Sequence, residues 1–367
     1  MKQHLTLSEL AAELERQQAA KVDYVADTRR MHFTTGFEDD QRPRSMIDLI
    51  GEGSSEATSD LLVLPHAHRQ IADHTGIPWK FYERLRVERG LASLLDENVN
   101  RLFHHEPKPR MIRTLDGQAR AFLSDGYRRL DNHDLAETII PILGEIPEVR
   151  FESCALTDSR MYIKALTPRV TGTVKVGEEV CAGVFISNSE IGAGSLRVEP
   201  FVYTLACTNG MVIPKGLGGE ALRRIHVGRR VEADEGFRVF RNETLMADDR
   251  AFFMAVGDVV RAAVDEVRFR DLVEAMQRAA DSETVRDAPA AIETLATRER
   301  LSDREAGGIL THLAAGGDLS RWGVLSAVTR QAEDVESYDR ATELEELGGK
   351  ILAYSDRDWR TIAGATS

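Results

Sequence analysis

One run of alternating apolar residues, 180–214, constrains the fold of this chain more than any other stretch. It reads VCAGVFISNSEIGAGSLRVEPFVYTLACTNGMVIP, and β-branched and aromatic residues dominate it, as on the pleated surface of a β-sheet. The apolar positions of its first part alternate at Val180, Ala182, Val184 and Ile186. Asparagine and glycine interrupt the pattern at 187–194 and 207–211, where strands are expected to turn. The run therefore predicts a β-hairpin or a β-meander.

The two interruptions carry side chains that can serve either a turn or a ligand. Asn-Gly is a common hairpin turn signal, and Gly210 in such a turn is expected at positive φ. Alternatively, Asn188, Ser189 and Asn209 expose polar groups that bond a ligand. The residues by themselves favour the turn, and the ligand interpretation remains open beside it.

The segments around this run supply further strands and many helices. A hairpin is predicted around Asp116-Gly117, a helix at 134–143 and a second hairpin at 149–166. Residues 167–179 are polar and contain glycine, which predicts a loop, and apolar residues recur at helical spacing from Ala251 onward. This order predicts an α+β fold: an antiparallel β-sheet core with helices on one face, a helical N-terminal segment and a helical C-terminal region.

Three regions follow from this assignment. Residues 1–105 are expected to be mainly helical, 106–245 to form the antiparallel β core with one helix, and 246–367 to be helical. Within the first region, Pro65 opens a helix, Gly76 stops it and Pro78 opens the next. This pattern fits two packed helices, and less strongly a DNA-reading helix-turn-helix.

Composition limits the class of protein. The chain has 367 residues, a formal net charge of −13, no apolar run of transmembrane length and no signal-peptide core, so we expect a cytoplasmic protein that does not contact a membrane. The acidic balance argues against a nucleic-acid coat but allows a local basic groove. Three cysteines without paired spacing predict buried thiols rather than disulfides or a zinc site.

Two basic clusters stand out against this acidic background. Seven lysines and arginines face three acids between residues 101 and 130, and residues 223–230 hold four arginines and a histidine. Either cluster can be a solvated face paired with surface carboxylates, or a surface that contacts phosphates.

Motifs of catalysis are missing from the sequence. It contains no G-x-x-x-x-G-K-[ST] loop, no dinucleotide fingerprint in strand-to-helix context, no G-x-S-x-G elbow and no H-E-x-x-H. We therefore expect no catalytic residues, no cofactor and no metal site, and the sequence gives no positive signal for an enzyme.

The run NSEIGAGSLRVE followed by CTNGM resembles the core of a family of phage- and plasmid-encoded proteins catalogued as domain of unknown function 932, and the likeness extends over about 61–359. The order of elements is also similar to that of phage single-strand annealing recombinases, by analogy of fold. This resemblance implies a non-enzymatic, homo-oligomeric protein that binds single-stranded DNA in replication or recombination of a mobile element. The alternative is a protein-interaction factor, for counter-defence or assembly, that uses its acidic helical C-terminus. The residues implied to contact DNA are Arg110, Arg113, Arg120, Arg128, Arg129, Asn188, Ser189, Asn209, Arg223, Arg224, Arg229 and Arg230.

Overall fold

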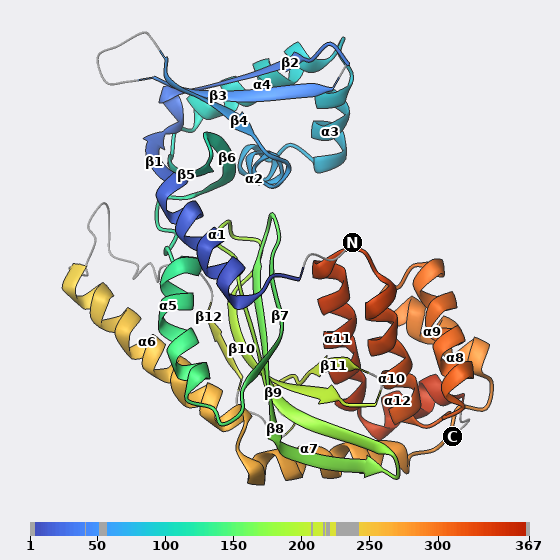
Figure 1. The fold of residues 1–367 in the computed structure, drawn as a ribbon. Helices are drawn as coiled ribbons and strands as arrows, with labels where there is room; N and C mark the ends of the chain where they lie inside the picture. The colour runs from blue at the N-terminus through green and yellow to red at the C-terminus, as the bar shows by residue number, and fades with distance from the viewer. Residues whose placement is uncertain are drawn as a thin grey trace.

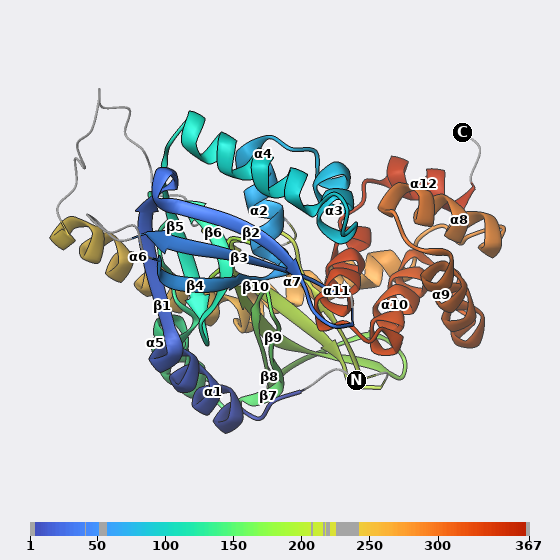
Figure 2. The same ribbon diagram turned by 90° about the horizontal axis from the view of Figure 1, so that it is seen from above.

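The computed structural model describes residues 4–40, 42–50, 57–206, 208–215, 217, 221–224 and 242–364. Within these residues the chain forms two β-sheets and twelve α-helices, which confirms the predicted α+β class (Figure 1). The first sheet with three helices makes an N-terminal unit, which lies over one end of the second sheet in both views (Figures 1 and 2). We call the second sheet the core sheet.

The N-terminal unit is built on six strands. Their spatial order is β1 (Lys21–Asp27), β5 (Pro109–Leu115), β6 (Gln118–Ser124), β4 (Ala57–Val63), β3 (Pro43–Ile50) and β2 (Met31–Phe37). Neighbours pair antiparallel except β4 with β6, which are parallel. Four of these strands lie within 1–105, so that region combines strands with its helices, and β5 and β6, which the sequence assigned to the β core of 106–245, belong to this sheet instead. Buried and less buried residues alternate along these short strands, as in β3, where Ile47 and Leu49 are buried.

Three helices cover one face of this sheet. They are α2 (Pro65–Thr75), α3 (Trp79–Val87) and α4 (Ala92–His105). As predicted, Pro65 opens α2 and Gly76 ends it in the left-handed conformation, with φ 69°. The apolar side chains of α2 and α3, among them Ile71 and Tyr82, pack into one cluster with those of the sheet. The structure thus places α2 and α3 as two packed helices.

The core sheet contains the run that organises the sequence. Its spatial order is β11 (Asn209–Val212), β10 (Leu196–Thr204), β9 (Glu178–Asn188), β8 (Met161–Lys175) and β7 (Arg150–Leu156), and β12 (Leu222–Arg224) pairs with the outer edge of β10. All of these pairs are antiparallel, which confirms the predicted meander. The loop expected at 167–179 is instead mostly strand, because β8 and β9 continue past Thr167 as a long hairpin that packs on α7 (Glu266–Ala280).

Helices cover both faces of the core sheet, whereas the sequence predicted one. On one face lie α1 (Leu7–Ala20), α5 (Asn132–Gly144) and α6 (Asn242–Ala263), where Ile139 and Val256 pack with Ile163 and Val184. On the other face, Tyr338 packs with Tyr162 and its neighbours. Figure 1 shows the C-terminal helices on that side. They are α8 (Ala288–Glu299), α9 (Asp303–Gly316), α10 (Arg321–Gln331), the short 3₁₀ turn η2 (Ala332–Asp334), α11 (Tyr338–Leu352) and α12 (Asp356–Ala363). Successive residues of β8 and β9 point to opposite faces of the sheet, and apolar residues are buried on both faces. Both faces must therefore be covered by helices.

Candidate binding pocket

The most central of the predicted DNA-contacting arginines is buried. Arg113 is 1% exposed, and it donates to Asp23 at 3.0 Å, to Asp131 at 2.7 Å and to the carbonyl of Glu190 at 3.0 Å. Burial by itself would lower the pKa of Arg113, but the carboxylates of Asp131 and Asp23 outweigh it and raise that pKa. A phosphate contact at Arg113 would therefore require breaking buried ion pairs, so we do not retain it as a binding residue.

Glu190 is the second centre of the same network. It belongs to the NSEIG motif, and it accepts hydrogen bonds from Arg120 at 2.6 Å and from the backbone N–H of Asn132 at 2.7 Å, with Lys21 at 3.7 Å. Arg120 and Lys21 come from the N-terminal unit, whereas Glu190 follows β9 of the core sheet. The motif thus fastens the two sheets together, which is a structural role for its charged residue.

Asn188 and Ser189 are also engaged within the chain. The amide of Asn188 donates to the carbonyl of Leu130 and to the side-chain oxygen of Asn132, at 2.8 Å each. The hydroxyl of Ser189 accepts from the backbone of Ala193 at 3.0 Å, and both residues are buried. Neither side chain is placed to donate to a ligand.

The other predicted arginines are dispersed. Arg110 donates to His74 at 2.5 Å, Arg129 is half-exposed beside Asp23 at 3.3 Å, and Arg128 is half-buried. Arg223 is exposed on β12 and donates to the hydroxyl of Ser195 at 2.9 Å. Two of the remaining residues and one side chain lie outside the described part of the chain: Arg229, Arg230 and the side chain of Arg224. Among the described residues, Arg113, Arg120 and Arg129 meet at one ion-pair network around Asp23 and Glu190, whereas Arg223 lies on β12 of the core sheet.

Among the described residues of the CTNGM segment, Thr208 lies in a turn and Asn209, Gly210 and Met211 lie in β11, so the turn is not at Asn209-Gly210 as the sequence predicted. Thr208 carries the positive φ, 54°, and Gly210 lies within β11 opposite Tyr203. A Cβ on Gly210 would lie 1.9 Å from Cζ of Phe201. Glycine is required there because an aromatic ring covers its backbone, and not because of its φ angle, which corrects the prediction.

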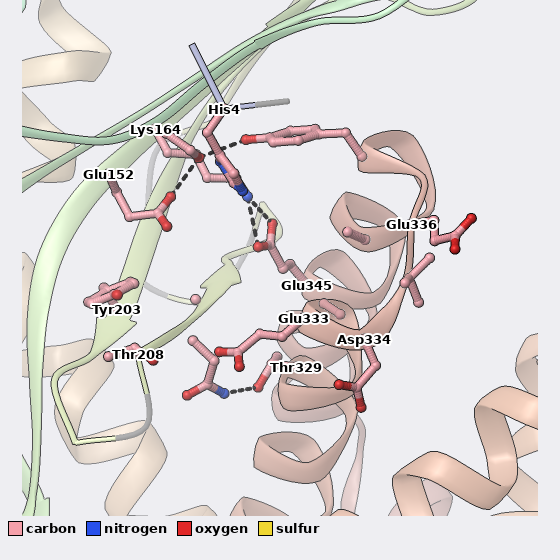
Figure 3. A pocket seen from close by; sticks show the side chains of 17 residues that line it. His4, Glu152, Lys164, Tyr203, Thr208, Thr329, Glu333, Asp334, Glu336 and Glu345 are labelled. Atoms are coloured by element: carbon pink, nitrogen blue, oxygen red, sulfur yellow. Dashed lines mark hydrogen bonds and ion pairs between the residues drawn. The ribbon is translucent and has the colours of Figure 1, made fainter. Parts of the chain in front are cut away.

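This segment also borders an open cavity of about 570 Å³ between the core sheet and the helices α10 and α11 (Figure 3). Figure 3 shows Glu152, Tyr203 and Thr208 along the strands, with Thr329 and Glu333 along the helices on the other side. The volume lies within the range of ligand sites, about 300–1,000 Å³. We call this cavity the acidic pocket.

The lining of the acidic pocket is mostly negative. Of the described residues that line it, one is a lysine, Lys164, and five are carboxylates: Glu152, Glu333, Asp334, Glu336 and Glu345. Lys164 is 4% exposed and its ammonium lies 2.7 Å and 2.6 Å from the two carboxylate oxygens of Glu345. These two charges cancel locally, and Asp334 lies 2.7 Å from Nε2 of His312, but carboxylates still outnumber cationic groups in the lining, so the field in the pocket is negative.

Lys164 is held as a cation. Burial would lower the pKa of its ammonium, but Glu345 and other nearby acidic groups outweigh burial and raise that pKa above its usual value. The ammonium also lies 5.0 Å from the ring centre of Tyr338 and 5.6 Å from that of Phe201. A protonated, paired lysine cannot serve as a nucleophile at neutral pH, so its role is to neutralise Glu345.

Asn209 contributes an acceptor to the acidic pocket. The residue is 6% exposed, and its amide donates to the hydroxyl of Thr329 at 2.5 Å. That hydroxyl donates in turn to the carbonyl of Ser326 at 3.1 Å, so it must accept from Asn209, and this fixes the orientation of the carboxamide. The buried Oδ1 of Asn209 has no hydrogen-bond partner among the described residues. Such an acceptor is costly unless a donor reaches it.

Sequence reasoning found only part of this pocket. Asn209 was singled out because it stands in a turn signal, whereas Lys164 and Glu345 are far apart in the chain and carry no local motif. Both are buried charges, which a pattern of apolar residues cannot reveal.

A group of three potential metal ligands lies on α5. His133, Asp134 and Glu137 have ligand atoms within 4.8 Å of one another, but the side chains of Asp134 and Glu137 are exposed. Exposed carboxylates at one turn of a helix are common without an ion, so the cluster does not indicate a metal site.

Comparisons with protein-family models, with curated proteins and with solved structures find no match for the chain. Across the described residues, every helix is too short or too polar to cross a bilayer.

Proposed function

We propose that this protein is a non-enzymatic binding protein whose acidic pocket receives a basic segment of a partner protein. The observation that carries the proposal is the lining of the pocket, in which the one described lysine is neutralised by Glu345 and the remaining charges are negative. A negative, partly enclosed surface attracts cations and disfavours phosphates. This supports the protein-interaction alternative over DNA binding at the same place.

The position of the carboxylates supports a partner larger than a single ion. Glu333, Asp334 and Glu336 are exposed at the rim, on η2 and the turn before α11, whereas Asn209 is buried below them. A side chain in the pocket would therefore leave its flanking residues beside the rim carboxylates. A segment with several basic residues can place one side chain in the pocket beside Asn209 and others beside the rim carboxylates.

The test is a binding titration with a labelled basic peptide, followed by fluorescence anisotropy. The rim variant combines Glu333→Gln, Asp334→Asn and Glu336→Gln. The control variant combines Glu106→Gln, Glu137→Gln and Asp258→Asn, which removes the same charge from exposed positions outside the pocket. Exposed pairs contribute about 0.5 kcal/mol each, so we expect about a tenfold loss for the rim variant and little change for the control. Equal losses in both variants would mean that net charge alone drives binding.

A second candidate function is binding of single-stranded DNA, as the resemblance implies. It is favoured by Arg223, which is exposed on β12 at the edge of the core sheet, next to Arg224. Replacing Arg223, Arg224, Arg229 and Arg230 by alanine should lower the log–log salt slope by roughly three units, at about 0.7 per phosphate contact. Gel shifts with single- and double-stranded DNA at two salt concentrations measure this. An absence of binding by the wild-type protein would remove the candidate.

A further inference from the structure

We infer that the floor of the acidic pocket is an anchor subsite for one guanidinium group, with Oδ1 of Asn209 as its fixed acceptor. This inference rests on the proposed function and deepens it, because it names the side chain that a partner inserts. It is carried by an orphaned buried acceptor on a residue that lines a negative cavity.

The orientation of Asn209 determines what the floor can accept. Because Thr329 takes the amide hydrogen and passes its own hydrogen to Ser326, the carboxamide cannot flip without losing a bond. A ligand at this place must therefore bring a donor. Water can supply one, but the cavity of about 570 Å³ is far larger than the roughly 30 Å³ that one water occupies in the liquid. There is room for a whole side chain.

The walls favour a planar cation with several donors. Glu152 stands on the strand side and Glu333 on the helix side, so acceptors face the cavity from two directions (Figure 3). Tyr203 adds a half-buried aromatic ring to the strand side. A guanidinium presents five N–H groups in a rigid fork and stacks on aromatic faces, whereas an ammonium is a compact, strongly hydrated charge. This set of groups selects arginine over lysine.

Three peptides that differ only at one central residue test the subsite. The residue is arginine, lysine or citrulline, which is the neutral analogue of arginine, and the flanking basic residues are the same in all three. We expect the wild-type protein to bind the arginine peptide about tenfold or more tightly than the citrulline peptide, with the lysine peptide between them, as charge-assisted hydrogen bonds require. Tighter binding of the lysine peptide would overturn the guanidinium assignment.

Two subsite variants, one in the floor and one in the wall, separate the subsite from the rim. Asn209→Ala and Glu152→Gln should each bring the affinities for the arginine and citrulline peptides close together, whereas the rim variant should weaken all three peptides by a similar factor. Glu179→Gln, an exposed carboxylate of β9 outside the described pocket lining, is the matched control and should leave the preference unchanged. If Asn209→Ala does not fold, Glu152→Gln decides the question. If both subsite variants still prefer the arginine peptide over the citrulline peptide as strongly as the wild type does, the subsite is refuted. Weaker peptide binding by the rim variant would still support the proposed function in that case.

A small probe distinguishes the two possible sources of the guanidinium. N-acetyl-arginine amide is titrated into the full chain and into the Glu152→Gln variant. Binding of this probe that depends on Glu152, together with no binding of any basic peptide, would refute a protein partner and keep the subsite as one for a free guanidinium compound. Binding of neither probe nor peptide would refute both the subsite and the proposed function.

Discussion

The guanidinium of Arg113 lies 2.7 Å from the carboxylate of Asp131, at the place where the N-terminal unit meets the core sheet. Arg113 comes from β5, and Asp131 is the residue that precedes α5. Burial would raise the pKa of Asp131, but Arg113 and Lys21 outweigh it and lower that pKa, so the carboxylate stays charged. The joint between the two parts of the molecule thus contains buried ion pairs beside an apolar cluster that includes Leu123 and Ile191, and it uses a residue that the sequence had suggested for DNA.

Removing the charge of Arg113 should destabilise the fold. Arg113→Met leaves buried carboxylates without their main partner, and breaking a buried ion pair costs about 3 kcal/mol or more. Urea denaturation followed by circular dichroism measures the free energy of unfolding. Arg101→Met, which removes an exposed arginine paired with Glu97 on α4, is the control and should change it by less than about 1 kcal/mol. Similar values for both variants would contradict the proposed joint.

Gly210→Ala should be destabilising for a steric reason. The added Cβ would collide with the ring of Phe201, and overpacking of this kind costs about 1–3 kcal/mol. Phe201→Leu in the same chain should recover part of the loss, because the smaller side chain makes room. Gly90→Ala, where a Cβ meets nothing within 4 Å, is the control. Thermal melting of the three variants tests this, and an unchanged melting temperature for Gly210→Ala would contradict the steric reason.

Acid should weaken the C-terminal helices through Glu305. Arg340 and Ser302 hold the pKa of this carboxyl at about 2, below its ordinary value of 4.5. A lowered pKa in the folded state gives stability that is fully present above about pH 4.5 and is lost as the pH falls toward 2. The variant Glu305→Gln should therefore lose less stability than the wild type between pH 5 and about pH 2. Melting curves across this range measure the difference, and parallel losses would contradict the prediction.

Two cysteines should resist alkylation in the folded protein. Burial raises the pKa of the thiols of Cys154 and Cys181 to about 11, so few thiolates exist at pH 8. Iodoacetamide labelling at pH 8, read by peptide mapping, should modify both residues in urea and leave them unmodified without it. Rapid labelling of either residue in the native protein would show that the strand carrying it opens readily.

The protein is expected to self-associate. Among the described strands β1 is an edge of its sheet, and its Val22 and Val25 are exposed at 49% and 55%. Light scattering across micromolar concentrations should show a species larger than a monomer, and Val25→Lys should reduce it, because a charge on an edge strand opposes pairing. A strict monomer at all concentrations would contradict this prediction.

Local signals of the sequence proved dependable wherever one short segment decides its own conformation. Capping boxes form at Thr6 and Ser302, and Asp116-Gly117 makes the predicted hairpin turn with φ 51° and 73°. The helix stop at Gly76 belongs to the same group. In each case the side chain bonds its own backbone, or the glycine supplies the required φ, so distant residues change little.

Contacts between distant segments decided the rest. Neither Arg113 beside Asp131, nor Lys164 beside Glu345, nor Phe201 over Gly210 can be inferred from neighbours in the chain, because each pair joins separate elements. The sequence by itself therefore determined the α+β class, several helix ends and most strands of the core sheet apart from 167–179, through periodicity and backbone preference. Only the tertiary structure decided that the arginines are ion-pair partners and that Asn209 lines an acidic pocket, because burial and charge compensation are properties of the packed molecule.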